Sequence, residues 1–139
     1  MIRRLTSKDF PKLREFFKNI RWNKLDQGGD WNVKKLEAEV PHGLYAYWRD
    51  SEIVAALSLR KTEWNWTIVF IGTLPSCRRQ GYARRLVQHL CKEFKTTVDL
   101  EVLQSNSRAI RFYDSLGFRK VGLRKDYYGP GQSAILLSM

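Results

Sequence analysis

The sequence predicts an α+β fold in which a central β-sheet, mixed but mostly antiparallel, is flanked by helices. Segments rich in β-branched and aromatic residues alternate with segments whose apolar residues recur at helical spacing, in the order β-α-α-β-β-β-α-β-α-β-β. The 139 residues contain no internal repeat, low-complexity tract or linker-like stretch. Residues 1–139 are therefore expected to form one domain.

The first elements are a short strand and an amphipathic helix. Residues 3–5 are expected to be an edge strand. Thr6 and Asp9 have the spacing of a capping box, with Asp in place of the usual Glu or Gln, and this predicts that a helix starts here. The apolar residues that follow at helical spacing are Phe10, Leu13, Phe16, Phe17 and Ile20.

A loop and a second, short helix come next. Residues 21–29 are expected to be a loop, with the pair Gly28-Gly29 as a breaker. The following helix is predicted from about residue 32 to 40, and Pro41 and Gly43 are expected to end it.

The middle of the chain favours strands. Residues 44–49 and 53–61 are predicted as two strands joined by a tight turn at Asp50-Ser51. Residues 67–73 are strongly apolar, which predicts a central strand, and Pro75 ends it.

The last part of the chain alternates helices with strands. Apolar residues recur at helical spacing over residues 81–95, and Ser105-Asn106-Ser107 can cap a further helix that runs to about Leu116, with Gly117 suited to its C-terminal cap. The strands expected in this part are residues 97–103, 118–124 and 133–139.

The composition restricts the class of protein. With 43% apolar residues the chain can bury a core without metals or disulfides, and its two cysteines, Cys77 and Cys91, have no metal-binding spacing. No apolar run approaches the roughly 20 residues of a membrane span, and the N-terminus lacks a signal-peptide pattern. A cytoplasmic protein that contacts no membrane is expected.

The net charge of +11 favours polyanionic partners, such as nucleic acid, the ribosome or a phosphorylated cofactor. A merely soluble, basic surface is the alternative interpretation, and the charge alone does not separate the two.

Residues 78–83, Arg-Arg-Gln-Gly-Tyr-Ala, join a predicted strand to a predicted helix. The N-terminus of a helix has unpaired N–H groups and the positive end of the helix dipole, and a glycine there lets a phosphate approach the backbone. Arg84 and Arg85 add positive charge. The pattern predicts a phosphate-binding turn; the alternative is an ordinary strand-to-helix turn. The glycine motifs of mononucleotide and dinucleotide folds are absent.

Two runs in this order resemble the GNAT superfamily of acyl-CoA N-acyltransferases. The first is Arg78-x-x-Gly81-x-Ala83, and the second is Asn106-x-x-Ala109-x-x-x-Tyr113-x-x-x-Gly117-Phe118. Within the superfamily, the part of the chain from about Thr67 to Met139 is similar to the bacterial ribosomal-protein alanine N-acetyltransferases and their archaeal relatives. The residues that carry this closer resemblance are 100–102, 105–106, 113–118, Gly122, Arg124 and 127–128.

The resemblance implies the GNAT fold, acetyl-CoA as the cofactor and acetylation of an α-amine. In the family pattern, the strand before the turn pairs its backbone with the pantetheine arm, and the N–H groups of the turn hold the pyrophosphate. The cofactor-binding residues that this implies are Ile71, Gly72, Thr73, Arg78, Arg79, Gln80, Gly81, Tyr82, Ala83, Arg84 and Asn106. Asn106 has an alternative role as a helix cap.

The resemblance also implies two catalytic residues and two that bind the acceptor. Glu101 would be the general base and Tyr113 the general acid, while Tyr127 and Tyr128 would contact the acceptor. Each has a structural alternative: Tyr113 shares a helix face with apolar residues, Glu101 could face solvent, and the two loop tyrosines could simply pack.

The free-energy cost of deprotonation favours an N-terminal amine as the acceptor. At neutral pH, deprotonating an α-amine costs roughly 1 kcal/mol and deprotonating lysine nearly 5 kcal/mol, so a modest base suits the α-amine better. However, Gln132-Ser133 stands where the ribosomal enzymes usually carry an acidic pair.

The expected partners are acetyl-CoA and an acceptor amine. A protein N-terminus, ribosomal proteins included, is the favoured acceptor. A small-molecule or lysine acetyltransferase is the alternative. A basic RNA- or ribosome-binding module that retains CoA as a ligand is the alternative from another class, and direct nucleic-acid binding is not favoured.

Overall fold

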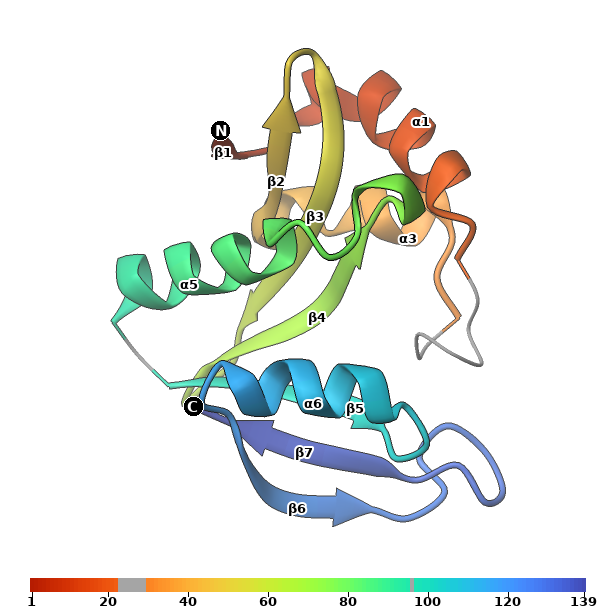
Figure 1. Ribbon diagram of the computed structural model, residues 1–139, viewed down its shortest axis with the longest axis vertical. Helices are drawn as coiled ribbons and strands as arrows, with labels where there is room; N and C mark the ends of the chain where they lie inside the picture. Colours follow the sequence, from red (N-terminus) through yellow and green to blue (C-terminus); the bar gives the residue numbers. More distant parts are fainter. Residues whose placement is uncertain (23–29, 96) are drawn as a thin grey trace.

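In the computed structural model, which describes residues 1–22, 30–95 and 97–139, one seven-stranded sheet runs through the molecule in the order β1-β2-β3-β4-β5-β7-β6 (Figure 1). All neighbouring strands are antiparallel except β4 and β5, which are parallel. The prediction of an α+β fold around a mixed, mostly antiparallel sheet is confirmed. Within the described residues, no helix has the length and apolar character that crossing a membrane requires.

The elements follow the predicted order with small differences at their ends. The strands are β1 (Ile2–Arg4), β2 (Leu44–Arg49), β3 (Glu52–Lys61), β4 (Trp66–Thr73), β5 (Val98–Leu103), β6 (Arg119–Arg124) and β7 (Ala134–Ser138). The helices are η1 (Ser7–Asp9), α1 (Phe10–Ile20), α3 (Val33–Ala38), α4 (Val40–Gly43), η2 (Pro75–Cys77), α5 (Tyr82–Phe94) and α6 (Ser107–Ser115). The expected edge strand and the expected central strand are confirmed as β1 and β4.

Capping residues locate several helix ends as predicted. The Oδ2 atom of Asp9 accepts a hydrogen bond from the N–H of Thr6 at 2.9 Å and closes the capping box. Asn106 caps α6, since its Oδ1 accepts a hydrogen bond from the N–H of Ala109 at 3.2 Å. Gly117 follows α6 with φ +102°, a left-handed conformation that glycine adopts without strain.

The expected end of the second helix at Pro41 is wrong. Pro41 lies in the first turn of a further short helix, α4. Proline is tolerated in a first turn, because an N–H there has no helical partner to lose. The expected loop over residues 21–29 falls mostly on residues 23–29, including the Gly28-Gly29 breaker, which lie outside the described residues.

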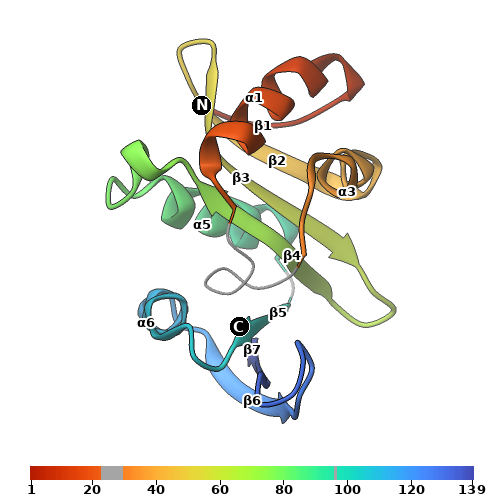
Figure 2. The same cartoon turned by 90° about the vertical axis from the view of Figure 1, so that its right-hand side faces the viewer.

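Helices cover both faces of the sheet (Figure 2). Helices α5 and α6 pack on one face around Leu86, Leu90, Leu100 and other buried residues. Helices α1 and α3, with the strands beneath them, bury a second cluster that includes Leu13 and Leu36. We call these the α5/α6 face and the α1/α3 face.

The parallel pair in the centre of the sheet is short. Strands β4 and β5 pair only from Trp66 with Val98 to Ile68 with Leu100. Beyond that point the two strands diverge, as Figure 1 shows. Among the described strands, the backbone of β4 from residue 69 to 73 therefore has no partner on its β5 side.

A β-bulge lies where the divergence begins. In the β3–β4 ladder Ser58 pairs with Phe70 and Leu59 with Ile68, so that Val69 is the extra residue. A bulge reverses the alternation of side chains. Accordingly Ile68 and Ile71 both pack in the α5/α6 cluster, whereas Phe70 packs in the α1/α3 cluster.

Candidate active site

The diverging strands border a cavity of about 1820 Å³. Among the described residues, its walls come mainly from β4, the turn before α5, β5, α6 and the loop between β6 and β7, with further side chains that include Trp22, Trp31 and Arg124. The structure thus brings together nearly all of the residues that the sequence singles out: Ile71, Gly72, Thr73, Arg78, Arg79, Gly81, Tyr82, Ala83, Arg84, Glu101, Asn106, Tyr113, Tyr127 and Tyr128 line this cavity.

Gln80 is the exception. It does not line the cavity, and its Nε2 atom donates a hydrogen bond to the backbone oxygen of Ser76 at 3.2 Å. The Gln80 side chain therefore stabilises the turn from outside the cavity. Its backbone N–H is the part of the residue that would take part in a phosphate site.

The turn before α5 has the features of an anion-binding site. Arg79 and Gly81 have φ values of +63° and +84°, and this reverses the chain before the first turn of the helix. No described backbone carbonyl accepts a hydrogen bond from the N–H groups of residues 80–84; the first one that is accepted in α5 comes from Arg85, to the oxygen of Gly81. These free N–H groups, at the positive end of a 13-residue helix, fit a phosphate.

The charge around the turn supports the same interpretation. Arg78, Arg79 and Arg84 line the cavity next to the turn, and Arg108 and Arg111 line it from α6. The Nη2 atom of Arg84 donates a hydrogen bond to Oγ of Ser115 at 2.7 Å and so links α5 to α6. Arg108 and Arg111 were missed as candidates from the sequence, although their i, i+3 spacing places them on one side of the predicted helix.

Glu101 is the one acidic residue among the described residues that line the cavity. It lies on β5 between the buried Leu100 and Val102, and its side chain is 25% exposed. Alternation along the strand places its carboxylate away from those two residues, on the α1/α3 face. Its partners are Arg124, whose Nη1 lies 3.3 Å from Oε1, and Tyr127, whose pKa is raised chiefly by its interaction with Glu101.

Tyr113 approaches from the α5/α6 face. It is 4% exposed, and its ring packs edge-on against Phe112 and Phe118 at centroid distances of 5.1 Å and 5.4 Å. Burial raises the pKa of the Tyr113 phenol, with a smaller contribution from Tyr128. Tyr113 is therefore both a core residue and a cavity residue, and its phenol remains protonated at any ordinary pH.

The loop between β6 and β7 supplies the two neighbouring tyrosines. Burial, followed by the charge of Glu101, raises the pKa of Tyr128 to about 12. The two rings pack edge-on at 5.1 Å. The loop is held together by backbone bonds between Tyr128 and Gln132 and between Gln132 and Gly129.

Three aromatic residues line the opposite wall. Trp22 and Trp31 each pack on Phe70, with ring centroids at 5.0 Å and 5.2 Å, and all three line the cavity. No motif in the sequence fixes the position of either tryptophan, because both lie far along the chain from the motifs and come together only at Phe70 of β4.

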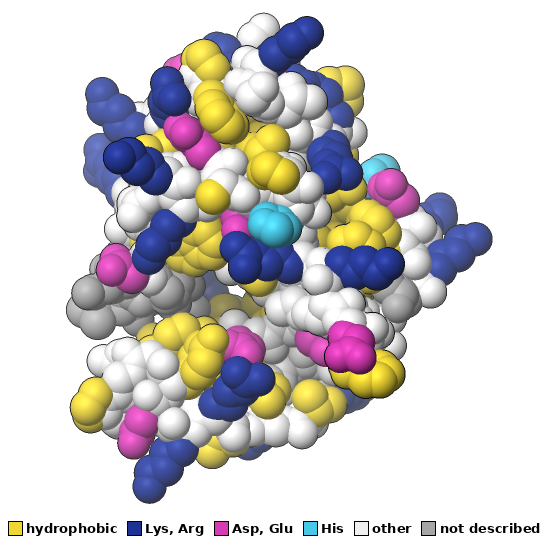
Figure 3. All heavy atoms as spheres, turned by 180° about the vertical axis from the view of Figure 1, so that it is seen from behind, with side chains coloured by type: hydrophobic (Ala, Val, Ile, Leu, Met, Phe, Trp, Pro, Cys, Tyr) yellow, Lys and Arg dark blue, Asp and Glu magenta, His cyan; other side chains and the backbone are white. Residues whose placement is uncertain are grey.

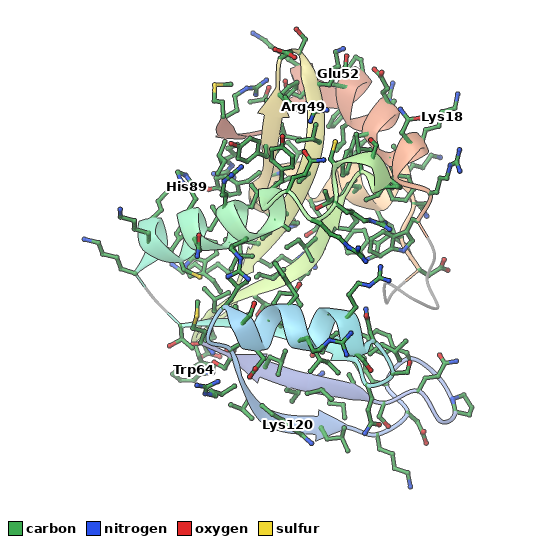
Figure 4. All side chains as sticks on the ribbon, in the orientation of Figure 1. Lys18, Arg49, Glu52, Trp64, His89 and Lys120 are labelled. Carbon is green, nitrogen blue, oxygen red and sulfur yellow. The ribbon has the colours of Figure 1, made fainter. Side chains whose placement is uncertain are left out.

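Of the described histidines and cysteines, Cys77 lines the cavity but is buried, whereas His42, His89 and Cys91 do not line it. His89 points outward from α5, with its Nε2 atom 3.3 Å from Oε2 of Glu93 (Figure 4).

Basic side chains are spread over the face seen in Figure 3, with acidic ones among them, and do not form one continuous patch.

Comparison with known proteins identifies the family. The family model of the acetyltransferase (GNAT) family matches residues 2–118. The [ribosomal protein bS18]-alanine N-acetyltransferase of Haemophilus ducreyi is 27% identical over all of this chain and 99% of its own length. An N-alpha-acetyltransferase of Saccharolobus solfataricus is 37% identical, over 51% of this chain and 46% of its own. In structure, the ribosomal-protein-S18-alanine N-acetyltransferase of Escherichia coli matches with a TM-score of 0.82 at 24% identity, covering 100% of this chain and 92% of the other. The chain therefore belongs to the GNAT family of acetyltransferases, whose acetyl donor is acetyl-CoA.

Proposed function

We propose that this protein transfers the acetyl group of acetyl-CoA to the N-terminal α-amine of a protein or peptide. The observation that carries the proposal is the placement of Glu101 and Tyr113, which reach one cavity from opposite faces of the sheet. This transfer needs a base for the incoming amine and an acid for the departing thiolate. The names of the two relatives, which act on alanine N-termini or α-amines, support the same acceptor.

The donor would bind along β4 and the turn before α5. The strand edge of Ile71, Gly72 and Thr73 is free to bond the pantetheine amides, and the N–H groups of residues 80–84 would hold the pyrophosphate. Asn106 caps α6 through Oδ1, which leaves its amide N–H groups for the pantetheine arm. When bound, acetyl-CoA supplies an acetyl thioester.

The chain's own residues would move two protons. Glu101 accepts the proton of the incoming α-ammonium. At neutral pH, freeing an α-amine of its proton costs roughly 1 kcal/mol, against nearly 5 kcal/mol for a lysine. Tyr113 donates its phenolic proton to the departing sulfur. Since burial keeps Tyr113 protonated, the acid is in its active form throughout the physiological range.

The acceptor would lie on the α1/α3 face, between the aromatic wall and Tyr127-Tyr128. The described lining of the cavity contains eight arginines and one acid, Glu101. Ser133 stands where the ribosomal enzymes usually carry an acidic residue. It is buried, and its Oγ accepts a hydrogen bond from the N–H of Asp126 at 3.2 Å. Acceptors with neutral or acidic residues after the N-terminus are therefore expected to react faster than basic ones.

A ribosomal protein is the finer proposal for the acceptor, and it is supported by the relative that matches along its whole length. We further propose that residues 1–139 act as one domain, because both halves of the chain line the cavity. A cytoplasmic location is supported by Cys77 and Cys91, which are both unpaired.

The experiment is release of free thiol from acetyl-CoA in the presence of a peptide panel. The panel varies the first residues and includes N-terminally blocked peptides that contain lysine. Turnover confined to free N-termini is expected. Turnover on the blocked lysine peptides would instead assign the protein to the lysine acetyltransferases, and measurable CoA binding without turnover on any peptide would refute the proposed acceptor.

Two variants test the assigned roles. Tyr113→Phe keeps the ring packing and removes the proton, so we expect kcat to fall by about 10²-fold or more while affinity for acetyl-CoA stays unchanged. Glu101→Gln should lower kcat similarly. Tyr45→Phe is the control, because Tyr45 is also buried in the α5/α6 cluster but does not line the cavity. Full activity of Tyr113→Phe from pH 6 to 9 would show that Tyr113 is not the acid.

A further inference from the structure

Strand β6 brings an arginine next to the proposed base. The Nη1 atom of Arg124 lies 3.3 Å from Oε1 of Glu101. The guanidinium carbon of the same arginine lies 5.4 Å from the centroid of the Tyr127 ring, and Glu101, Arg124 and Tyr127 all line the cavity. The three side chains form one cluster at the acceptor side of the cavity.

A second β-bulge puts Arg124 on this face. In the β6–β7 ladder Lys120 pairs with Leu137 and Gly122 with Leu136, so that Val121 is the extra residue. Without the bulge Leu123 would pair with Ala134, the place that Arg124 now takes. Because the alternation is reversed, Arg124 shares a face with Glu101.

Gly122 leaves open the space between the side chains of Arg124 and Glu101. Glu101 pairs with Leu136 on β7, and Leu136 pairs with Gly122 on β6. A Cβ at Gly122 would lie 3.0 Å from Cδ1 of Leu136, closer than ordinary contact. Because Gly122 has no side chain beside Leu136 and Glu101, the side chain of Arg124, two residues further along β6, can reach the carboxylate of Glu101.

The Arg124–Glu101 pair is weak enough to break during turnover. The side chains are 55% and 25% exposed, and an exposed ion pair is typically worth about 0–1 kcal/mol. A second cation could therefore displace the guanidinium at small cost. The Tyr127 ring offers Arg124 a contact that does not depend on the carboxylate.

We propose that Arg124 is a positioning residue that occupies the place of the acceptor's ammonium group in the free enzyme. It holds the carboxylate of Glu101 toward the cavity until the α-ammonium of the acceptor displaces it, and it then stays on the Tyr127 ring. The inference rests on the proposed function, in which Glu101 receives the acceptor amine. In addition, the acceptor then competes with a side chain of the enzyme, and a cationic group of the acceptor is needed to displace it.

Binding of matched peptides tests the competition without requiring catalysis. Calorimetry would compare a free peptide with its N-acetylated form on CoA-saturated wild-type protein and on Arg124→Gln. We expect the Kd of the free peptide to fall by up to about fivefold in the variant, which is the equivalent of 1 kcal/mol. The Kd of the acetylated peptide, which has no ammonium, should not change.

Controls separate this role from a structural one. Arg119→Gln removes a similar exposed ion pair on the same strand, with Asp114 at 3.4 Å, and should alter neither Kd. Arg124→Lys keeps a cation and should restore the wild-type affinity. Equal changes for both peptides, no change for either, or no binding of the free peptide would each overturn the inference. Binding as expected without thiol release in the wild type would instead refute only the proposed function.

Discussion

Replacing Gly81 by alanine tests the phosphate turn with a magnitude that the structure supplies. Gly81 has φ +84°, and a Cβ there would meet only the guanidinium of Arg85, at 3.8 Å. No steric clash is expected, so the effect of the alanine is conformational. Holding a residue with a Cβ in the left-handed region costs about 1–2 kcal/mol.

This strain can appear in two measurements. If the turn keeps its shape, the free energy of unfolding falls by about 1–2 kcal/mol. If the turn relaxes, acetyl-CoA must restore it on binding, and the Kd rises by about 5- to 30-fold for the same energy. The two losses are alternatives, so their sum in free energy should remain near this range. Gly81→Asp adds a negative charge at the proposed pyrophosphate site and should weaken binding further.

The assay is calorimetric titration with acetyl-CoA alongside urea unfolding. Gly131→Ala is the matched control, because Gly131 has φ +73° and a Cβ there would have no described atom within 4 Å. The control should lose similar stability and bind acetyl-CoA as wild type does. Gly81→Asp with wild-type affinity for acetyl-CoA would refute the assignment of this turn to the phosphates.

Three further predictions concern the framework of the site. Gly72→Ala would place a Cβ 2.5 Å from Cδ1 of the buried Ile20, so overpacking should lower the unfolding free energy by about 1–3 kcal/mol; unchanged urea unfolding would contradict this. Arg60→Met leaves the carboxylate of Glu39, which is 1% exposed, without its cation, and should cost about 3 kcal/mol or less because Arg60 is half exposed; the double variant with Glu39→Gln should recover most of that loss. The Tyr128 pKa of about 12 lies above that of the unfolded chain, so the unfolded state releases its proton first and stability falls as pH rises above about 10. Urea unfolding at pH 9 and 11 should show a smaller fall in Tyr128→Phe than in wild type, and equal falls would argue against the shift.

The sequence predicted those features that depend on residues close together in the chain. Helix α5 follows from the spacing of its apolar residues, and its start follows from a glycine that suits a left-handed turn. The caps at Thr6 and Asn106 are short-range hydrogen bonds, and so they are readable from the spacing of a few residues. The resemblance to the GNAT superfamily rests on motifs of this same local kind, which is why it reached the residues proposed for the donor site.

Only the tertiary structure decided how distant segments meet at the proposed acceptor side of the cavity. Trp22, Trp31 and Arg124 come from three regions without a common motif, and they line one cavity because β4 diverges from β5 after three paired residues. The bulges at Val69 and Val121 determine which side chains face that cavity, since one extra residue reverses the alternation of all that follow. A sequence specifies local periodicity directly, but the register between strands depends on pairing across the whole sheet. For this protein, local sequence therefore determined the fold class and the turn that we propose binds the phosphates, and long-range strand pairing determined the partners of Glu101.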